Sequence, residues 1–257
     1  MNLAEIDSTN AFLLKHAAAL PDGTIATAEV QTAGRGRQGR RWSAPRGSSV
    51  LLSALLHEPA GSVLHAWATL VAALAVRDGI AASTECRPTL RWPNDLVVGR
   101  RKLAGVLAES APFPAREPGG RIDAAIAAGG ATRALVIGIG VNCLQQRGHF
   151  SAELAEKATS LEIESQKPVA RTAVAAAILR ALDAWLTTAA AGAAGREQLR
   201  SAWRSHCQDI GNHVRVTEDG RAYSGTVLDI NDEGDLILQL DEGGRRHFGA
   251  AITTRAW

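Results

Sequence analysis

The stretch "QTAGRGRQGRRW", residues 31–42, has the glycine spacing G-x-G-x-x-G at Gly34, Gly36 and Gly39. That spacing is typical of a dinucleotide-binding turn, which needs a strand before the glycines and a helix starting within them, because the helix N-terminus holds the pyrophosphate. Residues 24–30, "TIATAEV", predict the strand. Residues 40–50, "RRWSAPRGSSV", do not predict the helix, since they contain proline and glycine and no apolar stripe. The dinucleotide fold is therefore excluded, and the stretch is interpreted as a glycine loop that carries guanidinium groups and one tryptophan.

Composition and charge narrow the class of protein. The chain has 257 residues, of which 46% are hydrophobic, so it can bury the core of one large domain or of a large and a small one. The net charge of +2 does not indicate nucleic-acid binding by the protein as a whole. Only four of the 28 basic residues are lysines, so an isolated arginine carries little functional weight.

The cysteines and the N-terminus predict a soluble cytoplasmic protein. Cys86, Cys143 and Cys207 are odd in number and lack metal-ligand spacing, which predicts buried, reduced thiols. The start "MNLAEIDSTN" has no basic and apolar signal-peptide pattern. The longest apolar run, residues 63–76, is too short to cross a bilayer, so no membrane contact is expected.

The pattern changes near residue 208, which predicts two domains, residues 1–207 and 208–257. Strand and helix patterns mix irregularly in the first part, with strands at "SSVLLSALL", "LVV", "KLAGVLAE" and "ALVIGIGVN". Helices are predicted after "DSTN", at residues 62–79 with a glycine end, at 168–191 and at 197–206. This indicates an α+β fold, a mixed sheet with helices packed on one face. Residues 112–121, "PFPAREPGGR", are predicted to be a surface loop.

The second part consists of short alternating strands. The segments "HVRVT", "RAYSGTVLDI", "DLILQL" and "RRHFG" are joined by turns rich in Asp and Gly. The prediction is a small all-β module of about fifty residues, a Greek-key or SH3-like barrel.

Five segments of the first part could converge on a ligand, and each has a structural alternative. "DSTN" at 7–10 could be an ordinary helix N-cap. The arginines of the glycine loop would repel one another on a bare surface, so an anion is the better interpretation. "RWPND" at 91–95 is also a common turn, and Trp92 could be a core residue. Lys102 in "RKLAG" could be a gatekeeper before a buried strand, and the glycines of "IGIGVN" could serve close strand packing as well as a ligand.

Taken together and in this order, these segments resemble one family over essentially the whole chain, the biotin protein ligases. The resemblance implies a class II synthetase-like catalytic domain followed by an SH3-like barrel. It also implies an ATP-dependent ligase that forms biotinyl-5′-AMP and transfers biotin to one lysine of a biotin carboxyl carrier protein of a carboxylase, such as acetyl-CoA carboxylase. The expected ligands are biotin, ATP and Mg²⁺ on the ATP phosphates. The protein would be a monomer or a homodimer.

The resemblance assigns roles to individual residues. Residues expected to bind biotin are Ser8, Thr9, Asn10, Gln31, Gly34, Arg35, Gly36, Arg37, Lys102, Gly105 and Gly138. Residues expected near ATP or the adenylate are Arg37, Arg40, Trp42, Asn94, Lys102 and Asn142. The catalytic set is Arg35, Arg37, Lys102 and Asp95. No motif holds a metal directly, and Mg²⁺ is expected near Asp95.

The chemistry of these residue types fits the reaction independently of the resemblance. A carboxylate that attacks an α-phosphate brings two anions together, so the reaction needs positioning and charge neutralisation. Arginine side chains offer forked donors to carboxylate and phosphate oxygens, and the glycines let backbone N–H groups approach. We hypothesise that Asp95 accepts the proton of the acceptor ammonium, which must be neutral to attack.

The chain departs from the family pattern at few positions, and two other functions remain as alternatives. Arg91 stands where the family more often has lysine, and Gln38 replaces a residue that is commonly basic or small. Some members carry an N-terminal helix-turn-helix, but "DSTN" begins at residue 7 here, so no sequence-specific DNA binding is expected. A lipoate–protein ligase would share the adenylation chemistry, and an RNA-binding module could use the arginine loop on phosphates. The aromatic content of 4% offers RNA bases few stacking platforms.

Overall fold

The first part of the chain forms a mixed sheet. The computed structural model describes residues 1–112, 132–250 and 252–255, so nearly all of the loop predicted at 112–121 lies outside the described residues. The described part contains a seven-stranded sheet with the order β1-β2-β3-β7-β6-β5-β4, in which β1 and β2 are parallel and all other neighbours are antiparallel. Its strands are β1 (Asn2–Leu3), β2 (Ile25–Ala28), β3 (Ser49–Pro59), β4 (Thr89–Arg91), β5 (Asp95–Val98), β6 (Arg101–Pro112) and β7 (Thr132–Asn142).

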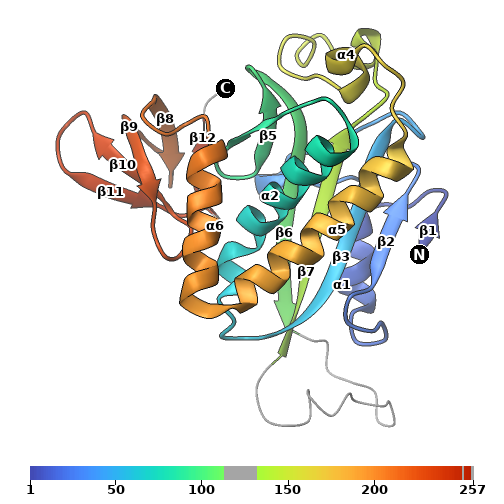
Figure 1. Cartoon of the computed structure of the whole chain (residues 1–257), viewed down its shortest axis with the longest axis horizontal. Coiled ribbons are helices and arrows are strands. Elements are labelled where there is room, and N and C mark those ends of the chain that lie inside the picture. Colours follow the sequence, from blue (N-terminus) through green and yellow to red (C-terminus); the bar gives the residue numbers. More distant parts are fainter. Residues whose placement is uncertain (113–131, 251, 256–257) are drawn as a thin grey trace.

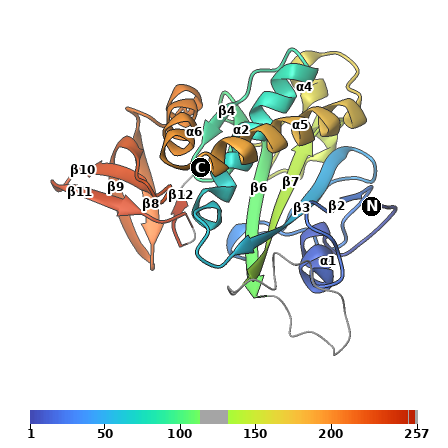
Figure 2. The same ribbon diagram turned by 60° about the horizontal axis from the view of Figure 1, so that its bottom comes forward.

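Helices cover both faces of this sheet. The described helices are α1 (Thr9–His16), α2 (Leu64–Ser83), α4 (Leu161–Ser165), α5 (Arg171–Ala190) and α6 (Gly192–His206). The long helices α2 and α5 pack on one face, as predicted, and α1 lies on the opposite face (Figure 2). The alternation of side chains along β3 explains this arrangement, because Leu52 and Ala54 join the core under α2 while Leu55 joins a second core with Leu13 of α1.

The helix predicted at residues 62–79 does not end at its glycine. Helix α2 continues to Ser83, and a Cβ at Gly79 would lie 2.5 Å from Cα of Ile178 on α5. The glycine therefore permits the close approach of two helices, and the prediction that the helix ends at Gly79 was wrong. By length and composition α2 and α5 could each cross a membrane, but they pack against each other, and α2 is mostly buried.

The C-terminal part forms the predicted all-β module. Its five-stranded antiparallel sheet has the order β11-β10-β9-β8-β12 among the described residues. The strands are β8 (His213–Glu218), β9 (Arg221–Ile230), β10 (Leu236–Leu240), β11 (Arg245–Phe248) and β12 (Thr254–Arg255). Valines and leucines that alternate along β8, β9 and β10 point into its core. With this sheet the predicted fold class is confirmed.

The module is joined tightly to the larger sheet. Cys207 forms a parallel bridge with Leu90 of β4, so the connecting segment extends the sheet at its edge. Helix α6 lies between the two parts (Figure 1). Trp67 of α2 donates its indole N–H to the carbonyl of Asp232 over 2.7 Å, in the turn between β9 and β10. These contacts fix the module against the domain that carries the predicted site.

Candidate active site

The floor of the site is one face of three neighbouring strands. Residues directly opposite each other in antiparallel strands point to the same face of the sheet. Two such rows cross β3, β7 and β6 on the face opposite α2: Leu51, Gly140 and Gly105, and then Ser53, Gly138 and Leu107. Three of these six positions are glycines, so the sheet has almost no side-chain cover there.

Three side chains fill the space over these glycines. A Cβ at Gly140 would lie 2.7 Å from the ring of Trp42, and a Cβ at Gly138 would lie 2.1 Å from Oδ1 of Asn10. At Gly105 the nearest atoms belong to Lys102, at 3.1 Å. The glycines of "IGIGVN" therefore admit site side chains onto the sheet, which decides against the close strand packing that the sequence left open.

One end of the floor carries a network of neutral polar groups. Ser53 donates to Oδ1 of Asn10 over 2.6 Å, and its hydroxyl lies 2.7 Å from that of Thr9. The backbone N–H of Thr9 donates to Oε1 of Gln31 over 2.8 Å. Ser8 is the N-cap of α1 and accepts from the N–H of Ala11, so the structural reading of "DSTN" holds alongside its place at the cavity.

The glycine-arginine stretch forms a short hairpin, which we call the arginine hairpin, residues 34–42. The N–H of Trp42 donates to the carbonyl of Gly34 over 3.0 Å, and that of Gly36 donates to the carbonyl of Arg40 over 2.7 Å. A Cβ at Gly34 would lie 2.3 Å from the carbonyl oxygen of Trp42, so this close pairing requires glycine. At the tip, Gln38 has a φ of 53°, a left-handed conformation.

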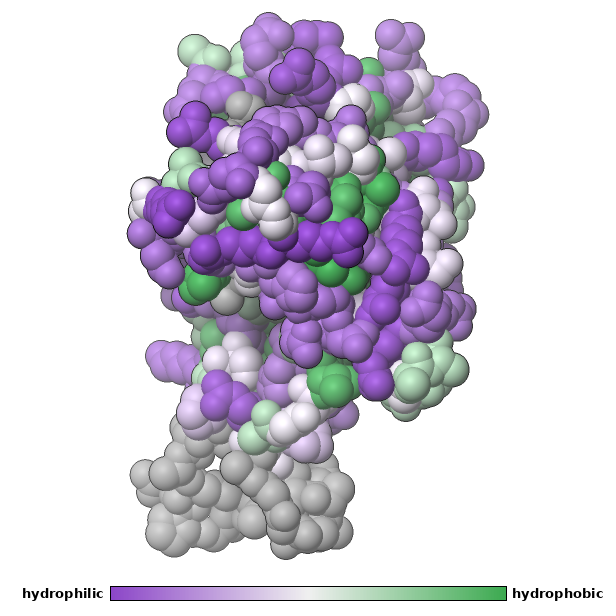
Figure 3. All heavy atoms as spheres, turned by 90° about the vertical axis from the view of Figure 1, so that its left-hand side faces the viewer, coloured by the Kyte–Doolittle hydropathy of each residue, from purple (hydrophilic) through white to green (hydrophobic). Residues whose placement is uncertain are grey.

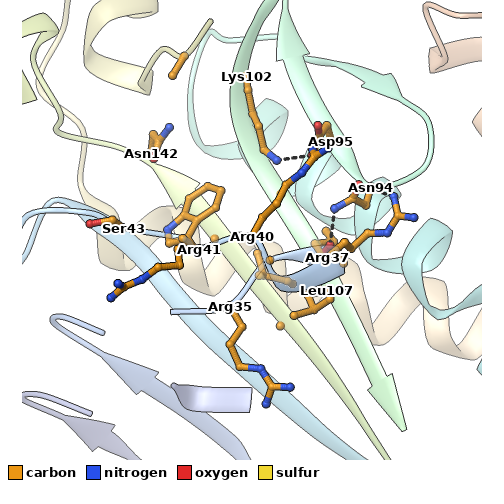
Figure 4. A pocket seen from close by; sticks show the side chains of 18 of the residues that line it. Arg35, Arg37, Arg40, Arg41, Ser43, Asn94, Asp95, Lys102, Leu107 and Asn142 are labelled. Atoms are coloured by element: carbon orange, nitrogen blue, oxygen red, sulfur yellow. Dashed lines mark hydrogen bonds and ion pairs between the residues drawn. The ribbon is translucent and has the colours of Figure 1, made fainter. Parts of the chain in front are cut away.

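Positive groups converge on Asp95 at the other end of the floor. Lys102 Nζ forms an ion pair with Asp95 Oδ1, and Arg40 extends toward this pair (Figure 4). Arg37 donates to Oδ1 of Asn94 over 3.3 Å, to the carbonyl of Thr253 over 2.8 Å and to that of Ala250. Burial lowers the pKa of Arg37 to about 10. A guanidinium that has lost this much water interacts more strongly with a bound anion.

Not every arginine of the hairpin faces this centre. The side chains of Arg35 and Arg41 point away from Lys102 and Asp95 (Figure 4). Arg35 pairs with Glu109 over 2.7 Å, and Arg41 donates to the carbonyl of Thr32 over 2.9 Å. In this structure Arg37, Arg40 and Lys102 are thus the cations that surround the predicted reaction centre.

The "RWPND" turn is held from two sides. Trp92 is 2% exposed and is a core residue, as the structural alternative allowed, and its backbone N–H donates to the buried Asp209 over 2.9 Å. Asn94 forms two hydrogen bonds with Val106. The backbone carbonyl of Asn94 accepts from the N–H of Val106 over 3.0 Å, and the side-chain amide of Asn94 donates to the carbonyl of Val106 over 2.9 Å. Asp95 begins β5 and does not lie in the turn itself, because it pairs with Arg91 across a tight hairpin.

The segment that follows the motif "IGIGVN" carries no motif of its own and closes the remaining side. Asn142, at the end of β7, donates to the carbonyl of Thr159 over 3.0 Å and accepts from Gln145 over 2.9 Å. The backbone N–H of Lys102 donates to the carbonyl of Lys157 over 2.7 Å. Residues 142–159 are therefore folded back beside Lys102, and they bring Phe150 and Leu154 to the cavity.

These elements enclose one cavity of about 470 Å³. It is lined by all the predicted site residues except Gly34, which lies in a smaller cavity behind the arginine hairpin. Lining residues that the sequence analysis did not name include Leu107, Phe150, Glu153, Leu154, Lys157 and Thr254. The period-2 pattern of β6 could have identified Leu107, because it is two residues beyond Gly105. No local signal marks Thr254, because it comes from the C-terminal module.

The indole of Trp42 has an unsatisfied donor at this cavity. Its Nε1 is buried and has no hydrogen-bond partner in the described part of the chain. Lys102 Nζ lies 5.8 Å from the centre of the indole ring. Buried donors are normally paired, so this N–H is suited to an acceptor on a ligand.

Comparison with known proteins agrees with the geometry. Residues 3–117 match the model of the biotin/lipoate A/B protein ligase family, and residues 209–252 match that of the biotin protein ligase C-terminal domain. The biotin–[acetyl-CoA-carboxylase] ligase of Mycobacterium tuberculosis is 35% identical, with 95% of this chain and 83% of that protein aligned. The chain belongs to the biotin protein ligase family. The predicted resemblance is thereby confirmed.

Other members of the biotin protein ligase family are similar over different lengths. The biotin–[acetyl-CoA-carboxylase] ligase of Paracoccus denitrificans is 32% identical, with 97% of both chains covered. The bifunctional ligase/repressor BirA of Bacillus subtilis is 31% identical, and the alignment covers 90% of this chain but 66% of that protein. A solved structure of biotin protein ligase from Aquifex aeolicus, in complex with biotin and ATP, superposes with a TM-score of 0.80 at 24% identity, covering 100% of this chain and 97% of that one. This last likeness concerns the fold.

Proposed function

We propose that this protein activates biotin with ATP and transfers it to a lysine of a biotin carboxyl carrier protein. The observation that carries the proposal is a cavity that has a neutral polar network at one end and Arg37, Arg40 and Lys102 around Asp95 at the other. A bicyclic urea fits the neutral end, and a carboxylate meeting a triphosphate fits the cationic end. The family membership supports the same reaction.

In the first step a carboxylate oxygen of biotin attacks the α-phosphorus of ATP. The bond from this phosphorus to the bridging oxygen breaks, and pyrophosphate leaves with the electron pair. Lys102 and Arg37 neutralise the two anions as they approach, and their partly buried setting strengthens this effect. Trp42 packs against the adenine and offers its unpaired N–H to an acceptor.

In the second step the amine of the acceptor lysine attacks the acyl carbon of biotinyl-AMP. The bond between this carbon and the phosphate oxygen breaks, AMP leaves, and an amide forms with loss of a proton. Asp95 is the carboxylate at the reaction centre and accepts this proton. In the free protein this carboxylate is paired with Lys102, and it becomes available when the ligand draws Lys102 away.

Magnesium enters the proposal as a companion of ATP. Among the described residues no three His, Cys, Asp or Glu side chains are grouped to hold a metal. One carboxylate, Asp95, and the amide oxygen of Asn94 fit a Mg²⁺ ion, which usually keeps its phosphate and water ligands and needs few from the protein. The ion would neutralise phosphate charge.

The carrier protein and the cellular location belong to the same proposal. The face of the molecule formed by the C-terminal module is mostly hydrophilic with small apolar patches (Figure 3). Such a surface suits a short-lived encounter with a carrier domain that must leave after each transfer. Cys86 and Cys143 are buried free thiols, which fits a reducing cytoplasm. We propose a monomer or a homodimer.

The test is biotin-dependent exchange of labelled pyrophosphate into ATP, followed by transfer of biotin to a carrier domain. Lipoate replaces biotin in a parallel reaction, because the family model that matches residues 3–117 includes lipoate ligases. Pyrophosphate exchange is expected with biotin and not with lipoate. Pyrophosphate exchange with lipoate and not with biotin would replace the proposal by lipoate ligation. Salt-sensitive RNA retention without exchange with either acid would favour an RNA-binding module.

A further inference from the structure

Glu109 is a carboxylate of the site region that none of the roles above uses. It lies on β6, two residues beyond Leu107, and therefore points to the same face of the sheet as the cavity floor. Glu109 lies opposite Val136 of β7, and this pair is the next one along the sheet after the pairs that contain Gly140 and Gly138. The side chain is 20% exposed and lines the smaller cavity behind the arginine hairpin.

The two oxygens of this carboxylate hold two different segments. Oε1 accepts from Arg35 of the arginine hairpin over 2.7 Å, and Oε2 accepts from Nδ2 of Asn10 on α1 over 2.9 Å. Asn10 is buried, at 4% exposure, and its Oδ1 accepts from Ser53 in the neutral polar network. One side chain therefore connects the neutral end of the cavity with the hairpin that supplies its cations.

The position of Glu109 is fixed more firmly than that of Arg35. Strand β6 pairs with β7 from Ala104 to Pro112, so the backbone at residue 109 is part of a continuous ladder. The arginine hairpin has a short ladder of its own and is otherwise held by side chains, among them Arg37 on the carbonyls of Ala250 and Thr253. Glu109 is thus the point at which the catalytic sheet itself holds the hairpin.

A negative charge beside an anion site weakens anion binding unless a neighbouring cation neutralises it. Glu109 neutralises Arg35, whose side chain points away from Lys102 and Asp95 (Figure 4). This pairing leaves Arg37 and Arg40 as the hairpin cations that face the reaction centre. The carboxylate therefore weakens anion binding only slightly, and it holds the hairpin in place before the anion arrives.

We propose that Glu109 is a positioning residue, which holds the arginine hairpin over the cavity through Arg35 and aligns it with Asn10 before ATP binds. The proposal rests on the proposed function for its kinetic consequence, but its structural consequence concerns the ligand-free protein alone. Because the Arg35 side chain is half exposed, the ion pair is weak and can break when ligands bind. Its effect is measured as the order of the hairpin and as kcat/KM for ATP.

The decisive variant is Glu109→Gln, which keeps the size of the side chain and an oxygen acceptor for Asn10 but removes the charge that attracts Arg35. Amide exchange of residues 34–42 in the ligand-free protein should become about fivefold faster. In pyrophosphate exchange, kcat/KM for ATP should fall about fivefold while KM for biotin changes less than about twofold. Glu58→Gln, which removes a carboxylate from the far end of β3, is the control for net charge and should behave as wild type.

A double-mutant cycle separates positioning from general damage to the fold. Arg35→Gln should accelerate hairpin exchange to the same degree as Glu109→Gln, and the double variant should add nothing further. Additive effects, or hairpin exchange in Glu109→Gln that equals wild type, would overturn the proposal. If Glu109→Gln does not fold, the exchange rate of Arg35→Gln decides alone: faster supports the proposal and unchanged refutes it. A wild-type protein without pyrophosphate exchange would refute the proposed function and leave the test of hairpin order intact.

Discussion

The floor of the cavity and the arginine hairpin are built in opposite ways. On the floor, β3, β7 and β6 are paired along their length, and the glycines at 138 and 140 sit in the middle of a continuous ladder. The arginine hairpin, residues 34–42, has few backbone bonds and relies on the side chains of Arg35, Arg37 and Arg41. The floor is thus fixed by its backbone, while the hairpin is held by side-chain contacts and carries cations that an anion would draw together. Ordering such a glycine-rich segment costs about 1–2 kcal/mol per residue.

The largest expected effect comes from the cation that the floor itself supplies. Lys102→Ala should fold normally and lose adenylate formation, because a charge-assisted contact in a partly dehydrated site is worth about 2–4 kcal/mol in the transition state. The corresponding fall in kcat/KM for pyrophosphate exchange is about 30- to 900-fold. Lys167→Ala, at an exposed ion pair with Glu85, is the matched control. Near-wild-type adenylation by Lys102→Ala would make the residue a gatekeeper of β6.

A pair of glycine substitutions separates the site from the core. Gly140→Ala places a methyl group 2.7 Å from the ring of Trp42, which belongs to a hairpin that can move, so stability should hold while adenylation falls about tenfold. Gly79→Ala places it 2.5 Å from the backbone of Ile178, where neither helix can yield easily. That variant should lose about 1–3 kcal/mol of unfolding free energy. Thermal unfolding and pyrophosphate exchange of both proteins measure the contrast, and equal behaviour would contradict it.

The hairpin is expected to depend on the C-terminal module. Thr253 is fully buried and donates its hydroxyl to Glu218 over 2.9 Å, which fixes the segment whose carbonyls accept from Arg37. Thr253→Val should therefore raise KM for ATP about fivefold, since it removes one hydrogen bond of about 1 kcal/mol. Arg246→Gln removes the other partner of Glu218 and should have little effect. A chain ending near His206 that biotinylates a carrier at the full rate would show that the whole module is dispensable.

The smallest expected effect is a change in mobility. When biotin and ATP are added together, amide exchange across residues 34–47 should slow about threefold or more, while β3 and β7 should change little. The adenylate supplies a phosphate for Arg37 and Arg40 and an adenine for Trp42, and a closed loop would keep water from the mixed anhydride. Equal protection of the loop with and without ligands would show that hairpin and floor are both preformed.

The sequence by itself predicted most of the helices and strands and most of the candidate site. The apolar runs "SSVLLSALL" and "ALVIGIGVN" predicted strands that the structure has, and alternating short strands with Asp/Gly turns predicted the C-terminal sheet. The motif residues that were predicted to share a ligand lie around one cavity, with Gly34 just behind it. These features are local, because strand periodicity and turn chemistry act over a few residues, and a reaction between two anions restricts which residue types can serve it.

Tertiary structure alone decided which partner each side chain contacts and which segments reach the cavity. Gly79 looked like a helix end and is a contact between α2 and α5, because the approach of Ile178 is set by packing far along the chain. Arg35 and Arg37 are alike in sequence, yet one is bound by Glu109 and the other by carbonyls of the C-terminal module. Phe150, Leu154, Lys157 and Thr254 reach the cavity without any motif. The partners of a side chain depend on which strands become neighbours, and that is fixed only when the whole core is packed.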